Sequence, residues 1–160
     1  STQAERDPNI VGELLKQYPM GGGDVLVVAS NSGRNACPVE LAMAAKERSV
    51  RTIAVINAEH SAKWTSRHPS GKRLGDVVDL VIDNCGVEGD ACVPLPGRGL
   101  SVGATSTVTG CMIMQMIACR ATEMLNASGR QPELYQSSNA NHDERNAALI
   151  AEHKQTNPHL

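Results

Sequence analysis

The sequence is poor in aromatic residues: among 160 residues there is no Phe, and there are two Tyr and one Trp. This scarcity argues against nucleic-acid binding, because almost no rings are present on which bases could stack. The sequence also has little excess charge of either sign, because 15 Lys and Arg and 17 Asp and Glu give a formal net charge of -2. Such a balance gives no electrostatic case for a nucleic-acid partner. The core must therefore be built from Val, Ile, Leu, Ala and Met.

Several motifs are also missing. The five cysteines form no CxxC pair and no Cys/His pair at zinc spacing, so no metal is expected, and we expect buried thiols in a reducing compartment. Neither GxSxG, nor a Walker A loop, nor GxGxxG occurs, so no cofactor is expected. Residues 1–8 lack the apolar segment of a signal peptide, and the uncharged stretch 100–119 carries six polar side chains. These features predict a cytoplasmic protein without a membrane partner.

Two unbroken apolar runs indicate an α/β fold. Residues 25–29 and 52–56 have the composition of strands in a parallel sheet that is covered on both faces. A turn over residues 30–35 and a helix from about Pro38 to Arg48 lie between them. Strand, turn, helix and strand within about thirty residues make a βαβ unit. The length of 160 residues suits one domain.

The remaining elements are predicted from local patterns. We expect a short helix over 9–17, a long loop over 57–72 and a short strand over 80–82. Residues 93–96, with two prolines, suit an edge strand or an extended connection. A helix from about 103 to 127 should be buried most of the way round, because residues 111–119 are apolar except for Gln115. A last helix fits residues 144–153. The predicted domain therefore covers residues 1–128, and residues 129–160 form a polar tail with a short helix.

The first candidate site is the turn between the first strand and the first long helix. Parallel strands end at the edge where α/β sheets bind ligands, and the start of a helix attracts anions. A glycine in this turn would let the backbone approach a ligand closely, and short polar side chains add donors. A plain helix cap that binds nothing is the alternative. The residues concerned are Ser30, Asn31, Ser32, Gly33, Arg34 and Asn35.

The second candidate site is a basic loop. From residue 60 to residue 75 there are four Lys or Arg, two His and no acid. This loop follows the second strand, so its charge should lie at the same sheet edge as the first site. We expect Arg67 and Lys72 to bind an anion with Ser66 nearby, and His68 to act as acid or base. A solvated basic loop is the alternative.

The third candidate site is the start of the long helix near residue 103. The hydroxyls of Thr105, Ser106 and Thr107 could cap this helix or hold a phosphate. The methionines further along the same helix are expected in the core or in a subunit interface rather than around a cofactor.

Together these segments resemble a known family. Residues 24–35 (DVLVVASNSGRN), 65–74 (TSRHPSGKRL) and 81–84 (VIDN), with GATSTVTG at 103–110, resemble a sugar isomerase (SIS) domain, in the uncharacterised branch labelled as phosphosugar or phosphoheptose isomerases. The resemblance implies a three-layer α/β/α domain with a mainly parallel sheet that binds a phosphorylated sugar, in dimers or tetramers. It implies that Ser30, Asn31, Ser32 and Asn35 hold the phosphate, with Thr105, Ser106 and Thr107 nearby.

The resemblance also implies an activity and a departure from the family. The activity would be aldose–ketose isomerisation of a sugar phosphate, by proton transfer through an enediol. Family members carry helices, a strand and a second Gly/Ser-rich turn before this region, whereas only 23 residues precede Asp24 here. Three alternatives follow: an isomerase or part of one, a non-catalytic sensor of sugar phosphates, or a half-domain whose N-terminal elements come from a partner chain.

Overall fold

A computed structural model describes residues 3–137, 139, 143–155 and 157 of the chain. Its first half alternates helices with parallel strands, its second half begins with a β-hairpin, and the hairpin leads into a long helix. In chain order the elements are η1 (Ala4–Arg6), α1 (Ile10–Gln17), β1 (Val25–Ala29), α2 (Ala36–Glu47), β2 (Arg51–Ile56), α3 (Ala58–Lys63), α4 (Leu74–Val77), β3 (Leu80–Asp83), β4 (Ala91–Leu95), β5 (Leu100–Ala104), α5 (Thr105–Ala127) and α6 (Asp143–His153).

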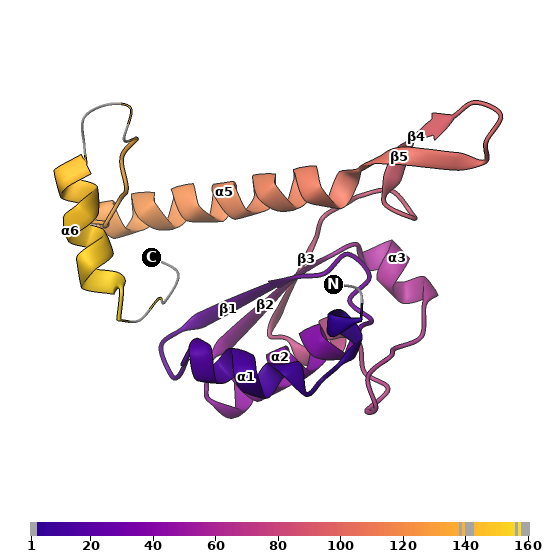
Figure 1. The fold of residues 1–160 in the computed structure, drawn as a ribbon, viewed down its shortest axis with the longest axis horizontal. Coiled ribbons are helices and arrows are strands. Elements are labelled where there is room, and N and C mark those ends of the chain that lie inside the picture. The colour runs from indigo at the N-terminus through magenta and orange to yellow at the C-terminus, as the bar shows by residue number, and fades with distance from the viewer. Residues whose placement is uncertain (1–2, 138, 140–142, 156, 158–160) are drawn as a thin grey trace.

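The central element is a three-stranded parallel sheet in the order β1-β2-β3 (Figure 1). Val28 of β1 lies opposite Ala54 of β2, which in turn lies opposite Val81 of β3. The predicted βαβ unit is therefore present, with α2 as its crossover helix. The α/β class and the parallel sheet are confirmed. The short helix over 9–17, the strand over 80–82 and the last helix over 144–153 were also predicted at the positions of α1, β3 and α6.

The core lies between the sheet and α2. Residues of α2 at intervals of three turn inward, and Val39, Ala42 and Ala45 are completely buried. Val39 and Ala42 pack with Val28, Ala54 and Ile56 of the sheet and with Leu74 of α4. Because alternate residues of a strand point to opposite faces, the other sheet face carries Val25, Val27, Ile53 and Leu80.

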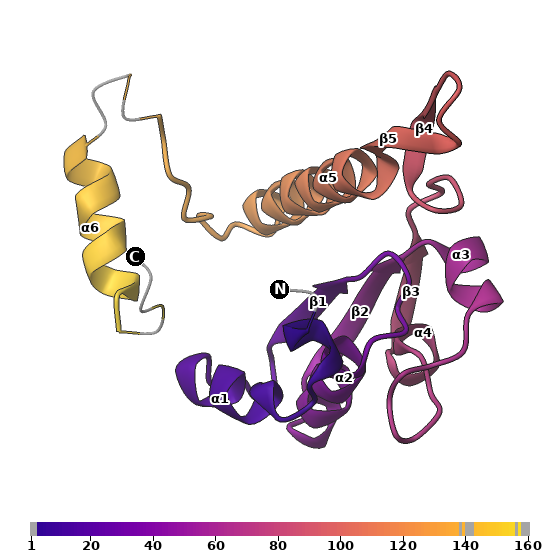
Figure 2. The same ribbon diagram turned by 45° about the vertical axis from the view of Figure 1, so that its right-hand side comes forward.

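That other face is only partly covered by the residues that the structure describes. Val25 is 59% exposed and Leu80 is 53% exposed. In both ribbon views α5 runs on this side of the sheet, opposite α1 and α2, and stands away from the strands (Figures 1 and 2). The sequence predicts cover on both faces. Within the described chain the second face is buried at Val55 of the central strand but not at Val25 and Leu80 of the outer strands.

The prediction that α5 is buried is wrong for the described chain, in which no residue of this helix is buried. Met112 is 63% exposed and Met116 is 60% exposed. The cause is the hairpin, because β5 pairs with β4 in antiparallel fashion and carries α5 away from the sheet (Figure 1). An apolar composition favours burial of a helix, but it does not determine which other element, if any, packs against that helix.

Other local predictions also need correction. Residues 93–95 form the end of β4 in a two-stranded sheet, which agrees with the edge strand predicted as one alternative, whereas β5 was not predicted. The thiols expected in the core are not buried: Cys37 is partly exposed, and the others are exposed at positions 85, 92, 111 and 119. In the described part of the chain, no helix has the length and apolarity needed to cross a membrane.

The predicted loop over 57–72 contains a helix, α3, that sequence analysis missed. Its six residues are too few to show helical periodicity. The signal that was present is Asn57, whose side-chain oxygen accepts a hydrogen bond from the His60 amide at 2.8 Å. Asparagine is a favoured residue at this capping position, and the cap starts the helix directly after β2.

An ionised carboxylate joins β2, β3 and α2, and it makes stability depend on pH. Asp79 lies 2.9 Å from Lys46 Nζ and accepts hydrogen bonds from the amide and hydroxyl of Thr52. The ion pair with Lys46, and then the bonds from Thr52, lower the pKa of Asp79 from 3.8 to about 2. Because the folded pKa is depressed, the carboxylate stabilises the fold fully above about pH 4. This stabilisation is lost as the pH falls through about 2.

We therefore expect the destabilisation caused by Asp79→Asn to be largest near neutral pH and to shrink steadily below about pH 4. Urea unfolding of both proteins across that range measures it. Asp143→Asn, at the start of α6, is the control. A penalty that stayed constant with pH would contradict the ion-pair role.

Candidate functional site

The candidate site lies where the three parallel strands end. Asn31, Asn57 and Asn84 each follow one of these strands, and hydrogen bonds join them. The Asn84 amide nitrogen Nδ2 donates to Asn31 Oδ1 at 3.0 Å, and the Asn57 backbone amide donates to the Asn31 carbonyl at 3.0 Å. Asn57 is 2% exposed and Asn84 is 5% exposed. The three asparagines therefore form a hydrogen-bonded polar layer at the carboxyl ends of the strands, and each buried side-chain amide in this layer has a partner.

Gly86 lets the next loop lie directly against this layer. Its carbonyl accepts a hydrogen bond from Asn57 Nδ2 at 2.6 Å, and its amide donates to Asn84 Oδ1 at 2.9 Å. A Cβ atom at this position would stand 2.8 Å from Thr105 Oγ1 and 3.1 Å from Asn84 Oδ1. Only glycine fits such a gap. The start of α5 is therefore held against the end of the sheet.

The turn between β1 and α2 adopts the tight form expected of it. Gly33 has a φ of 58°, a left-handed conformation that favours glycine, and its amide donates to the Ser30 carbonyl at 3.0 Å. The Gly33 carbonyl accepts a hydrogen bond from the Leu74 amide at 2.7 Å. The turn is thus anchored to α4, and it leads directly into α2, whose first amides favour an anion.

A cleft of about 510 Å³ opens beside this turn. The hydroxyl residues of the turn meet the first residues of α2, a carboxylate of η1 and an imidazole of α3. Its lining consists of Glu5, Val28, Ala29, Ser30, Asn31, Ser32, Cys37, Pro38, Leu41 and His60. Burial, and then the carboxylates of Glu5 and Asp7, raise the pKa of the Cys37 thiol. This thiol is therefore protonated at neutral pH and is not an activated nucleophile.

Three of the six predicted turn residues line the cleft: Ser30, Asn31 and Ser32. The Asn35 side chain is hydrogen-bonded to two other residues of the chain. Its Nδ2 donates to Glu5 at 2.6 Å, and its Oδ1 accepts from Arg67 at 2.9 Å. The amide of Asn35 therefore links η1 to the basic loop.

The basic loop reaches the turn, as the sequence predicts. The Arg67 amide donates to the Arg34 carbonyl at 2.8 Å. Ser66 closes the loop internally, because its hydroxyl donates to the Lys72 carbonyl at 2.6 Å and accepts from the His68 amide at 2.9 Å. Lys72 itself is exposed. The roles of Ser66, Arg67 and Lys72 toward a ligand stay predictions.

His68, the predicted acid or base, is buried away from the cleft lining. It is 9% exposed, and its Nε2 lies 2.9 Å from Glu40 of α2. Its Nδ1 accepts a hydrogen bond from the Ser70 amide and lies 2.7 Å from the Ser70 hydroxyl. The proton is therefore on Nε2 and is donated to Glu40. With both nitrogens engaged, this imidazole fastens the basic loop to α2.

His60 is the imidazole that lines the cleft, and sequence analysis did not select it. Its Nδ1 accepts a hydrogen bond from the Gly89 amide at 3.5 Å, which leaves the proton on Nε2. Its ring makes an edge contact with Trp64, with the centroids 6.2 Å apart. The available signal was its place three residues after Asn57, in the first turn of a helix that follows a strand.

The start of α5 is occupied by a carboxylate of the chain itself. Asp90 accepts hydrogen bonds from the Ser106 amide at 2.7 Å, from the Ser106 hydroxyl at 2.8 Å and from Thr105 Oγ1 at 3.2 Å. Burial alone would raise the pKa of Asp90, but these hydrogen bonds outweigh it and lower the pKa. Thr105 and Ser106 therefore bind Asp90, and Thr107 is exposed. The phosphate role predicted for these three residues stays untested, and an anion there would have to displace Asp90.

One group in the described chain has the composition of a metal site. Glu133, Glu152 and His153 each place one ligand atom within 4.8 Å of the others, near α6. Both glutamates are exposed, and His153 already lies 2.5 Å from Glu133. Exposed acidic groups of this kind are common without a metal.

Comparison with known proteins places the chain in a family. Residues 1–57 match the SIS domain model, and this stretch contains β1, the turn, α2 and β2. A UPF0309 protein of Listeria innocua is 37% identical over 161 residues, which cover 100% of this chain and 65% of that protein. UPF0309 proteins of Shouchella clausii and Geobacillus kaustophilus are 39% and 36% identical, over 88% and 100% of this chain and 58% and 64% of theirs. The chain thus spans less than two thirds of the length of these relatives, and it belongs to the SIS domain family as a relative of the UPF0309 proteins.

Proposed function

We propose that the cleft beside the turn of residues 30–35 binds the phosphate of a phosphorylated sugar. The observation that carries this proposal is the position of Ser30, Asn31 and Ser32, which line the cleft where β1 ends and α2 begins. Serine hydroxyls, backbone amides and the positive end of a helix are the usual means of binding a phosphate. Membership of the SIS domain family supports the same ligand class.

The proposed reaction is aldose–ketose isomerisation, carried by this chain or by a longer protein that contains it. A base removes the proton from the carbon next to the carbonyl, the C–H electrons form the enediol double bond, and the carbonyl oxygen takes a proton. The former carbonyl carbon then takes a proton from the acid while the oxygen on the other carbon loses its proton, and this leaves the carbonyl on that carbon. His60 and Glu5 are the titratable acid–base groups of the cleft, and we assign the transfer to them instead of His68.

Two functions other than isomerisation also remain proposals. A sensor would bind sugar phosphates in the same cleft without proton exchange. A half-domain would need a partner, and the exposed face of α5 supports association with a second copy or with a chain that supplies further elements. A cytoplasmic location stays a prediction.

The phosphate role is tested by replacing one cleft hydroxyl. We expect Ser32→Ala to weaken binding of glucose 6-phosphate and of inorganic phosphate by about tenfold, because a hydrogen bond to a charged group contributes about 1.5 kcal/mol. Isothermal titration calorimetry measures both affinities. Ser101→Ala, in the exposed strand β5, is the matched control and should bind as the parent does. Equal affinity of Ser32→Ala and the parent would refute the site.

A second measurement on the same protein preparations distinguishes an isomerase from a sensor. Exchange of a substrate C–H proton with D₂O, followed by NMR over a panel of aldose and ketose phosphates, should require His60 and should persist in His68→Gln. Binding without exchange across the panel would favour a sensor.

A further inference from the structure

We propose that Arg6, Arg34 and Arg67 form a second anion subsite beside the cleft, which binds another phosphate or carboxylate of a doubly anionic sugar. The three residues are called the arginine cluster below. This inference rests on the proposed function, because it specifies the class of phosphosugar that the cleft accepts.

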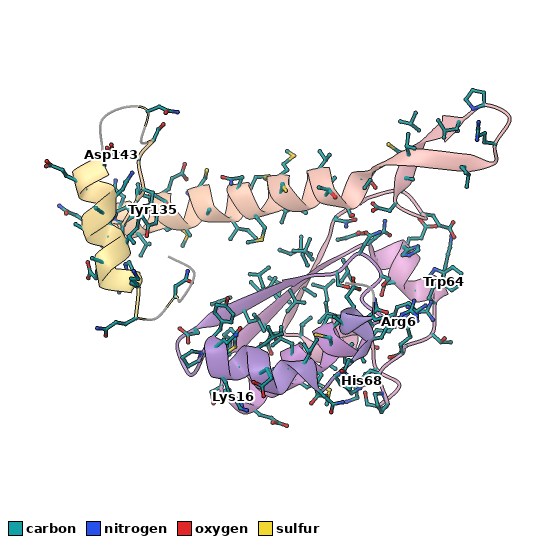
Figure 3. All side chains as sticks on the ribbon, in the orientation of Figure 1. Arg6, Lys16, Trp64, His68, Tyr135 and Asp143 are labelled. Atoms are coloured by element: carbon teal, nitrogen blue, oxygen red, sulfur yellow. The ribbon has the colours of Figure 1, made fainter. Side chains whose placement is uncertain are left out.

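The cluster is connected to the cleft by direct contacts. Glu5 lines the cleft and accepts a hydrogen bond from Asn35, which in turn accepts one from Arg67. The Arg67 amide donates to the Arg34 carbonyl, so these two arginines are neighbours although they are far apart in the chain. Arg6 follows Glu5 directly in η1. Figure 3 shows Arg6 on the same side of the molecule as Trp64 and His68.

The arginines are oriented by neutral groups. Arg67 Nη1 donates to the Asn35 amide oxygen at 2.9 Å, and Arg34 Nε donates to the Thr65 carbonyl at 2.9 Å. The Arg34 guanidinium also lies over the Trp64 ring, 5.4 Å from its centroid. Each contact positions a guanidinium without neutralising its charge, and each leaves further N–H donors for a ligand.

None of the three arginines forms an ion pair with another described residue, whereas Arg73 and Arg120 each pair with a carboxylate. Loss of hydration first, and then the like charges of Arg34 and Arg6, lower the pKa of Arg67, while Glu5 acts in the opposite sense. Three positive charges thus stand against the carboxylates of Glu5 and Asp7, the two neighbours of Arg6 in the chain. Like charges held together in this way repel one another, and a bound anion relieves that repulsion.

The test compares ligands that differ by one anionic group. Fructose 6-phosphate is paired with fructose 1,6-bisphosphate, and glucose 6-phosphate is paired with 6-phosphogluconate. We expect the parent chain to bind at least one doubly anionic member about tenfold more tightly than its partner, because one charge-assisted contact contributes about 1.5 kcal/mol. The bisphosphate reports a second phosphate, and 6-phosphogluconate reports a carboxylate.

The variants are Arg6→Gln and Arg34→Gln, with Arg120→Gln on exposed α5 as the matched control. Both cluster variants should lose most of the tenfold preference, and Arg6→Gln, which lies outside the turn of residues 30–35, should keep its affinity for glucose 6-phosphate within about twofold. Circular dichroism melting checks that each variant is folded. The Arg6 side chain is exposed and forms no hydrogen bond or ion pair with the described residues, so its replacement breaks none.

Three results would overturn the subsite. These are equal binding of the paired ligands by the parent, an equal loss for both ligands in Arg6→Gln, or the same loss in Arg120→Gln. Failure of the proposed function looks different, because binding of glucose 6-phosphate would then be insensitive to Ser32→Ala. An arginine-dependent preference that survived that result would leave the cluster as an anion site outside a phosphosugar cleft.

Discussion

Replacing Leu74 with alanine is expected to lower the free energy of unfolding by about 3 kcal/mol. Leu74 is completely buried and packs in the core between the sheet and α2. Deleting most of its side chain removes the transfer free energy of the lost methyl groups and leaves a cavity beneath β2. Its Cβ lies only 3.4 Å from the position that a Cβ on Gly33 would take, so the cavity would open directly under the turn of residues 30–35.

Urea unfolding monitored by circular dichroism measures this loss. Leu100→Ala is the control, because Leu100 is 63% exposed on the hairpin and its truncation should change stability by less than about 0.5 kcal/mol. If Leu74→Ala lowered the free energy of unfolding no more than Leu100→Ala does, this result would contradict the packing of Leu74 under the turn.

The second large effect is expected for Asn57→Ala, at about 2 to 4 kcal/mol. The substitution leaves the Gly86 carbonyl and the His60 amide without their buried partner. It removes the cap of α3 as well as the link between β2 and the loop that meets α5. Because His60 loses its anchor, affinity for glucose 6-phosphate should fall together with stability.

The control for this variant is Asn126→Ala, an exposed residue near the end of α5. Unfolding and calorimetric titration are compared for both variants with the parent. A fully stable Asn57→Ala protein would show that the polar layer at the strand ends is not a structural unit. Full stability with lost binding would instead confine the role of Asn57 to the position of His60.

The parallel sheet and the tight turn of residues 30–35 could be predicted because their determinants are local. Unbroken apolar runs indicate buried strands, and Gly33 between short polar residues indicates a tight turn before a helix. Two serines selected in that way, Ser30 and Ser32, do line the cleft. The approach of the basic loop also followed from topology, since the carboxyl ends of parallel strands share one edge.

The remainder depends on contacts between distant residues. Asn31 and Asn84 are 53 positions apart, and no local pattern reports that their amides meet. Arg6 lies in a three-residue turn near the start of the chain, whose position beside Arg67 is set by the link through Asn35. His68 was favoured because a histidine in a basic loop looks reactive, but its contact with Glu40 of α2 is set by tertiary packing.

The exposed helix α5 has a consequence for the way this chain exchanges its amide hydrogens. A helix of 23 residues without buried side chains has little besides its own hydrogen bonds to protect its amides, because most of the stability of helices in proteins comes from tertiary packing. The amides of α5 should therefore exchange orders of magnitude faster than those of α2, although both segments give the same helical signal. A neighbour that seats on Met112 and Met116 would slow that exchange without any change in secondary structure. The rate of amide hydrogen exchange in α5 therefore reports whether another molecule is bound to this helix.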